Sequence, residues 1–188
     1  EDLSYIKSAE ETLRSKMQDD WMDYYKSRPE IAELIAVQSA LTLSKETNAQ
    51  LHIVHLGTGN AAQLLDEYEN VSGETAPHYL EFSTSDLKRI GGALKTAPVV
   101  KPKGNAKKLW ELLDNGTINF VASDHAPAPD FMKDTGSAWD DYAGIPGSGT
   151  LFPYLYSEGY RKRDIRLSTF LQIIAENSAK RYGIFNRK

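Results

Sequence analysis

The sequence predicts an α/β fold with a parallel sheet, and three observations support this prediction. Short apolar segments alternate with helical patterns, and these segments are hydrophobic on both faces, as buried parallel strands are. Strands that alternate with helices are joined by right-handed crossovers and therefore pair in parallel. Three such strands in 188 residues are too few to close an eight-stranded barrel, which takes about 250 residues. They form either a small open sheet or part of a barrel.

The chain begins with a polar helical lead-in, residues 1–26, which has only sparse apolar positions. A second helix is expected to start directly after it. Ser27 suits the capping position, Pro29 suits the first turn, and Glu30 completes a capping box. Apolar or amide side chains follow at helical spacing, namely Ile31, Leu34, Ile35, Gln38 and Leu41. We therefore separate the lead-in from the β/α units of residues 27–188.

The rest of the chain alternates between the two kinds of element. Strands are expected at residues 51–56 and 118–122, with a further strand end and its loop in residues 74–80. Helices are expected at residues 60–68, 84–90, 106–113, 151–160 and 168–182. A long loop rich in Pro, Gly and Asp spans residues 126–148.

Composition narrows the class of protein. The net charge of −4 is mild and the basic residues are scattered, so no nucleic-acid partner is expected. Cysteine is absent, which excludes disulfides and thiolate metal sites. No apolar run approaches the roughly 20 residues that span a bilayer, so we expect a cytoplasmic protein without a membrane partner. The chain starts at Glu1 with neither a signal peptide nor an initiating Met, which suggests that the gene begins further upstream.

Two polar side chains follow predicted strands. His55 lies at the carboxyl end of the strand at 51–56, and Asp124 follows the strand at 118–122. Ligands and catalytic groups collect at that end of parallel strands. An imidazole and a carboxylate are suitable zinc ligands, and an ionised Asp beside a metal also accepts a proton from water. His55 and Asp124 are therefore candidate metal ligands, and Asp124 is the candidate catalytic residue.

Each of these residues also has a plainer interpretation. His55 could be a packed histidine at a strand end, and Asp124 could start a loop by binding its own backbone. His78 follows a strand and either supports the site or is merely exposed. His125 either orients Asp124 or caps the turn. His52 is expected on the opposite strand face from His55, against covering helices, because side chains alternate along a strand.

The ordered set of motifs from about residue 27 onward resembles the later part of the cyclic amidohydrolases, a family that includes dihydroorotase, allantoinase and hydantoinase or dihydropyrimidinase. The matching stretches are His52-Ile53-Val54-His55-Leu56, Glu74-Thr75-Ala76-Pro77-His78-Tyr79-Leu80, Lys95-Thr96-Ala97-Pro98, Leu109-Trp110 with Asn115-Gly116-Thr117-Ile118, Ser123-Asp124-His125-Ala126-Pro127 and Gly144-Ile145-Pro146-Gly147. The resemblance implies the later portion, about strands 6–8 and their helices, of a distorted (β/α)₈ TIM-type barrel. Residues 1–188 would then be a partial barrel domain.

The resemblance also implies roles for individual residues. His55 would be the sixth-strand ligand, and Asp124 the eighth-strand ligand and general base, of a site with one or two zinc ions. Water activated by the metal attacks an amide carbon of a ring, and Asp124 passes the proton to the leaving nitrogen. The segments at Ala97 and Gly144 would contact the substrate. The family's His-x-His pair, its carboxylated Lys or Asp and its fifth-strand His have no counterpart here, so the isolated chain is expected to be inactive.

The ring substrate is expected to be of the hydantoin, allantoin or dihydropyrimidine type. Dihydroorotase is the alternative, although Ala97 and Ala128 stand where that subfamily commonly has Asn and His. A protein from another class, a non-catalytic amidohydrolase-like scaffold, would lack the upstream ligands. A small open α/β binding domain without a metal is a further alternative. The complete protein is expected to form a homo-oligomer, as most members of the family do.

Overall fold

Three short strands form one parallel sheet in a computed structural model that describes residues 1–184. The strands are β1 (Leu51–Ile53), β2 (Val71–Thr75) and β3 (Phe120–Val121), in the order β1-β2-β3. Leu51 is paired with Val71 in the first ladder, and Thr75 with Val121 in the second. The α/β class and the parallel pairing predicted from the sequence are confirmed. β1 and β3 are shorter than the apolar runs that predicted them. β2 begins before the predicted strand end at residue 74, and helix α5 (Pro77–Glu81) takes the place of the predicted loop.

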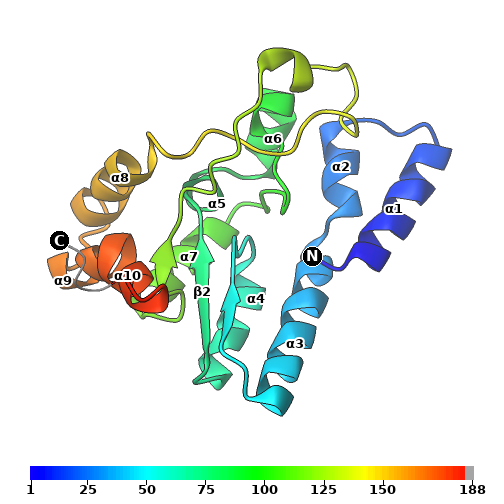
Figure 1. Ribbon diagram of the computed structural model, residues 1–188. Coiled ribbons are helices and arrows are strands. Elements are labelled where there is room, and N and C mark those ends of the chain that lie inside the picture. Colours follow the sequence, from blue (N-terminus) through cyan, green and yellow to red (C-terminus); the bar gives the residue numbers. More distant parts are fainter. Residues whose placement is uncertain (185–188) are drawn as a thin grey trace.

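Helices flank the sheet on both sides, with α1 to α3 towards one end and α8 to α10 towards the other (Figure 1). The α-helices are α1 (Leu3–Ser15), α2 (Trp21–Ser27), α3 (Glu30–Thr47), α4 (Gly59–Gln63), α5 (Pro77–Glu81), α6 (Thr84–Ile90), α7 (Asn105–Asp114), α8 (Leu151–Tyr154), α9 (Leu167–Leu171) and α10 (Asn177–Arg181). Three short 3₁₀ helices are η1 (Leu64–Glu67), η2 (Gly91–Leu94) and η3 (Asp130–Met132) in the described residues. Two segments with the wider turns of a π-helix are η4 (Leu155–Arg161) and η5 (Gln172–Glu176). The wider turns continue α8 and α9, so the two last predicted helices are confirmed in extent.

The lead-in differs from its prediction in two ways. It is two helices, because the chain turns at Met17, whose φ is 55°. The predicted capping role of Ser27 is wrong. Ser27 is the last residue of α2 and donates to the carbonyl of Tyr24, while Pro29 precedes α3 without a side-chain cap.

The buried face of α3 also differs from its prediction. Ile31 and Ile35 are exposed, whereas Ala32, Val37 and Leu41 are buried. Apolar residues lie on more than one face of this helix, so their spacing alone does not select the face that packs. The contacts with the sheet and the following loop make that choice, and they bring Glu33 to the inside.

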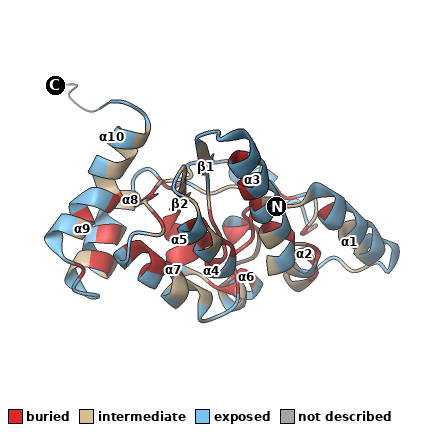
Figure 2. Cartoon of the chain, turned by 90° about the horizontal axis from the view of Figure 1, so that it is seen from below, coloured by how far each residue is buried: buried red, intermediate tan, exposed pale blue. Residues whose placement is uncertain are grey.

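The core lies between the sheet and helices α4, α5 and α7. Leu56, Leu80, Leu109, Leu113 and Ile118 are all almost fully buried there. Figure 2 shows the same concentration of buried residues around the strands, α5 and α7, while α1 and α9 are largely exposed. In residues 1–184 no helix is long and apolar enough to cross a membrane.

Candidate metal and substrate site

The polar residues predicted from the sequence lie beyond the carboxyl ends of the three strands. His55 follows β1 by two residues, His78 lies in α5 directly after β2, and Asp124 follows β3 by three residues. Because β1, β2 and β3 run parallel, these ends meet along one edge of the sheet. The fold therefore places all three side chains on the side where α/β proteins collect their ligands.

His55 and Asp124 share an uncommon backbone conformation. Their φ angles are 43° and 46°, in the left-handed region that residues other than glycine seldom occupy. Such a conformation costs about 1–3 kcal/mol and is concentrated at functional sites. The left-handed turn at His55 comes after the end of β1, so strand alternation does not extend to this residue. His52 and His55 are among the residues that line a cavity of about 220 Å³.

His52 has a structural environment, made up of strand neighbours and of the end of one covering helix. Its ring contacts the side chains of Ser72 and Glu74 on β2, with Nδ1 2.8 Å from Ser72 Oγ and Nε2 3.1 Å from Glu74 Oε2. The ring also stacks on Phe120 of β3, with the centroids 5.2 Å apart. These strand residues account for both ring nitrogens. The ring also packs edge-on against Tyr182, which directly follows α10, with the centroids 6.0 Å apart, so the expected contact with a helical layer is present as well.

His78 lies against Asp124. Its Nε2 is 3.6 Å from Asp124 Oδ2, and its ring packs on Tyr79 with the centroids 4.0 Å apart. Burial lowers the pKa of His78 to about 4, and nearby His55 acts in the same direction. The imidazole is therefore neutral at pH 7. Its buried Nε2 has no hydrogen-bond partner among the described residues, so this atom is free to contact Asp124 or a group bound beside it.

The residues present fit a zinc site in kind but not in number. His55 offers an imidazole and Asp124 a carboxylate that is about one-third exposed, and both types of ligand suit zinc. No group of three His, Cys, Asp or Glu side chains within residues 1–184 has the geometry to hold a metal. A tetrahedral site needs further ligands from outside the described part of the chain.

The turn after His55 is held by a residue that the sequence analysis did not select. Glu33 of α3 is buried, and its Oε1 accepts hydrogen bonds from the backbone N–H groups of Gly57 at 2.7 Å and Thr58 at 3.1 Å. Lys101 Nζ lies 3.8 Å from the other carboxylate oxygen and donates to the carbonyl of Arg28. Burial raises the pKa of Glu33 to about 7. Glu33, Val37 and Leu41 are spaced four residues apart and therefore share one face of the helix. This spacing is the sequence signal that could have identified Glu33 as an inward-facing residue.

The two predicted substrate segments lie next to each other. The N–H of Gly144 donates to the carbonyl of Lys95 at 2.9 Å, two residues before the exposed Ala97. A side chain at Gly144 would come within 2.6 Å of the Ala126 carbonyl oxygen, so this close approach requires glycine. His125 is exposed, and its Nδ1 accepts from the N–H groups of Gly147 at 3.0 Å and Ser148 at 3.2 Å. His125 thus contacts the turn after Gly144.

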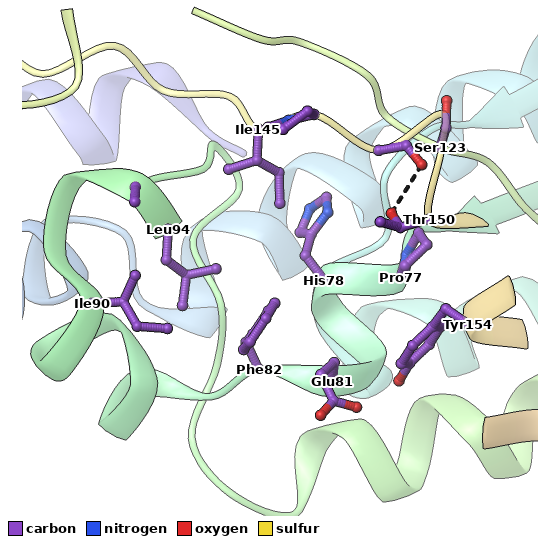
Figure 3. A pocket seen from close by; sticks show the side chains of 13 residues that line it. Pro77, His78, Glu81, Phe82, Ile90, Leu94, Ser123, Ile145, Thr150 and Tyr154 are labelled. Carbon is purple, nitrogen blue, oxygen red and sulfur yellow. Dashed lines mark hydrogen bonds between the residues drawn. The ribbon is translucent and has the colours of Figure 1, made fainter. Parts of the chain in front are cut away.

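A mostly apolar cavity of about 380 Å³ borders the site. His78 and Ser123 line it on the side of the strand ends, and Phe82, Leu94, Ile145 and Tyr154 form much of the remaining wall. Figure 3 shows Ile145 above His78, with Leu94 and Tyr154 on opposite sides. The cavity is therefore enclosed by α5, η2 and the loop that carries Gly144.

Comparison with known sequences gives two consistent findings. The chain is 36% identical to an allantoinase of Deinococcus radiodurans, over 98% of this chain and 42% of that protein. It is 38% identical to an allantoinase of Rubrobacter xylanophilus, over 94% of this chain and 39% of that protein. The chain thus spans about two fifths of the length of these relatives. A scan against models of protein families found no match.

Solved structures resemble the same part of the fold. An L-hydantoinase (dihydropyrimidinase) from Arthrobacter aurescens superposes with a TM-score of 0.93 at 30% identity, over 98% of this chain and 42% of that protein. A dihydropyrimidinase from Brevibacillus agri gives 0.92 at 27% identity with the same coverage. A dihydroorotase from Campylobacter jejuni gives 0.66 at 22% identity, which is a likeness of fold alone.

Proposed function

Because this chain belongs to the cyclic amidohydrolases, of which it spans a part, we propose that it contributes to the active site of an enzyme that hydrolyses a ring amide. The bond cleaved is a C–N bond in a ring of the hydantoin, allantoin or dihydropyrimidine type. The observation that carries the proposal is the meeting of His55, His78 and Asp124 beyond three adjacent parallel strands. Such a meeting provides metal ligands and an acid–base group at one place.

The chain is proposed to be the later portion of a (β/α)₈ barrel. Within residues 1–184 the sheet has β1 and β3 at its two edges, and both edges expose backbone groups that a closed barrel would pair. The relatives are more than twice as long as the part matched here, which leaves room for the other strands. Residues 27–188 would supply strands 6–8, and residues 1–26 would lead into them.

Zinc is the proposed cofactor. His55 and Asp124 would hold it, together with ligands from the rest of the barrel. When bound, the metal polarises the scissile carbonyl and lowers the pKa of water. The donor set supports this choice because both side chains follow strand ends in a strained backbone conformation.

Asp124 is the proposed general base and acid. Its carboxylate accepts the proton of the attacking water and delivers it to the ring nitrogen as the C–N bond breaks. His78 is uncharged at pH 7, and its unpartnered Nε2, 3.6 Å from Asp124 Oδ2, would orient the carboxylate by donating a hydrogen bond to it after a small approach. The backbone at Ala97 and Gly144 would bind the ring, and His125 would hold the turn beside it.

Allantoin, hydantoin and dihydropyrimidine rings are favoured over dihydroorotate. The curated relatives are named allantoinases, and the more similar solved structures are hydantoinases or dihydropyrimidinases. Ala97 and Ala128 offer methyl groups where a dihydroorotase commonly has an amide and an imidazole. A scaffold function is less well supported, because His55 and Asp124 are both present and keep strained turns. A homo-oligomeric state and a cytoplasmic location remain predictions from the sequence.

The test is hydrolysis of dihydroorotate, allantoin, hydantoin and dihydrouracil by the full-length protein loaded with zinc. Replacement Asp124→Asn is expected to lower kcat by at least about 100-fold, the usual contribution of a general acid–base group. Asp130→Asn, at an exposed carboxylate in the following loop, is the matched control and should keep the parent rate. Full activity of the Asp124→Asn enzyme would remove the proposed role.

A further inference from the structure

Lys133 makes an unusual set of contacts for a residue in a long loop. Its ammonium donates to three backbone carbonyls, those of Gly144 at 2.7 Å, Tyr142 at 2.8 Å and Lys95 at 3.3 Å. An ammonium has three N–H donors, so all of them are used. The three carbonyls belong to two segments that are distant in the sequence and that both approach the proposed substrate site.

The same two segments form adjoining walls of the cavity beside His78. Leu94 precedes Lys95, and Ile145 follows Gly144, so each wall residue is next to a carbonyl that Lys133 binds. The hydrogen bond from Gly144 N–H to the Lys95 carbonyl also links these segments. Without the Lys133 ammonium, the carbonyls of Tyr142 and Gly144 would lose the cation that ties them to the Lys95 carbonyl.

We propose that Lys133 is a positioning residue that fixes the Gly144 loop, residues 142–148, against the Lys95–Ala97 segment, and so sets the shape of the cavity where the ring binds. This inference rests on the proposed function for the nature of the ligand. It concerns a residue that does not touch the reacting atoms and acts through the backbone of Gly144.

The surroundings of Lys133 support a specific positioning role, called the clamp below, in preference to a general contribution to stability. The carbonyls that it binds lie outside the sheet, so no strand ladder competes for them. Burial lowers the pKa of Lys133, while nearby Asp141 opposes this effect. Lys95 performs a similar task one step away, because its ammonium donates to the carbonyls of Trp139 and Asp141. The two lysines thus hold different parts of the loop.

The experiment compares Lys133→Met, Lys133→Arg and the control Lys107→Met in the full-length, zinc-loaded protein. Lys107 is a highly exposed lysine on α7. Its replacement makes the same Lys-to-Met change at a position away from the loop. Amide hydrogen exchange of residues 142–148 reports the clamp directly. The KM and kcat for the best ring of the substrate panel report its effect on binding.

Lys133→Met is expected to speed exchange at Gly144 by about tenfold or more, the effect of losing hydrogen bonds to a charged donor. It should raise KM by about tenfold and change kcat by less than about threefold, because ring placement depends on the loop. Lys133→Arg should recover part of the KM, since its planar fork reaches fewer of the three carbonyls. Lys107→Met should change neither quantity.

Two results would overturn the clamp. The first is unchanged exchange at residues 142–148 in Lys133→Met. The second is faster exchange spread evenly over the protein with an equal fall in kcat and no change in KM, which would indicate a purely structural role. If the parent hydrolyses none of the rings, the proposed function fails, and the exchange measurement still decides the clamp.

Discussion

Two loops of the proposed site are each held by one charged side chain, and they are held in opposite ways. The turn after His55 is fixed by Glu33, a carboxylate that accepts from backbone N–H groups. The Gly144 loop is fixed by Lys133, an ammonium that donates to backbone carbonyls. Glu33 is 2% exposed and belongs to a long helix, whereas Lys133 is half-buried and belongs to the loop that it holds.

The difference follows from the backbone groups that each loop leaves unpaired. Gly57 and Thr58 precede α4, and the N–H groups at the start of a helix have no partner within it. The Glu33 carboxylate accepts hydrogen bonds from these N–H groups and lies beside the buried ammonium of Lys101. Its removal would therefore leave the two N–H groups without an acceptor and the Lys101 ammonium without a counter-charge. The Gly144 loop presents carbonyls instead, and it lies nearer to solvent. The comparison teaches that the turn after His55 is anchored to the buried core, while the Gly144 loop is anchored to neighbouring loop segments nearer the surface.

The largest effect is expected for Glu33→Ala. It removes the acceptor of two buried N–H groups and leaves Lys101 without its carboxylate, so the free energy of unfolding should fall by roughly 3–5 kcal/mol. Urea unfolding of the full-length protein measures this change. Glu46→Ala, at an exposed position of the same helix, should alter it by no more than about 0.5 kcal/mol. A loss as small as that of the control would show that Glu33 does not anchor the His55 turn.

A smaller effect is expected for Gly147→Ala on the other loop. The new side chain would come within 1.9 Å of the Ser123 carbonyl oxygen, so the loop must move away from the end of β3. We expect a loss of about 1–3 kcal/mol, as for other overpacked sites. Gly149→Ala provides the control, because a side chain there meets nothing within 4 Å. Equal unfolding curves for the two variants would show that this loop accommodates the new side chain without a loss in the free energy of unfolding.

The smallest effect concerns pH and the second lysine of the loop. Burial lowers the pKa of Lys95 from 10.5 to about 8. Between these values the unfolded chain binds a proton that the folded protein has released, so this group makes the free energy of unfolding rise with pH. Lys95→Met lacks the effect. The stability of the parent minus that of the variant should therefore grow between pH 8 and pH 10 in urea unfolding, and a constant difference would contradict the assignment.

The sequence located the candidate site residues in the fold better than it located the elements that support them. His55, His78 and Asp124 were selected because polar residues stood directly after apolar runs, and parallel strand ends must meet. Ser27 was misassigned as a cap because its pattern fits a helix start equally well whether or not the preceding helix extends to it. The expected placement of His52 and His55 on opposite faces assumed an unbroken strand, whereas β1 ends at Ile53 and His55 adopts a left-handed turn.

Glu33 and Lys133 show what local patterns do not reveal. Each acts on backbone groups nine or more residues away. Every residue has a backbone carbonyl and nearly every one an N–H, so the sequence does not indicate which of these groups a charged side chain will bind. The face of α3 that is buried was likewise settled by packing, because apolar residues occupy several of its faces.

By itself the sequence determined the α/β class, the parallel order and the polar residues at the strand ends, including Asp124. These follow from short-range periodicity and from the geometry of parallel strands, which hold whatever surrounds them. Only the tertiary structure decided that His78 faces Asp124, that Glu33 anchors the His55 turn and that Lys133 joins two distant segments. Those contacts depend on which buried groups lack partners once the chain has packed, and that is a property of the fold as a whole.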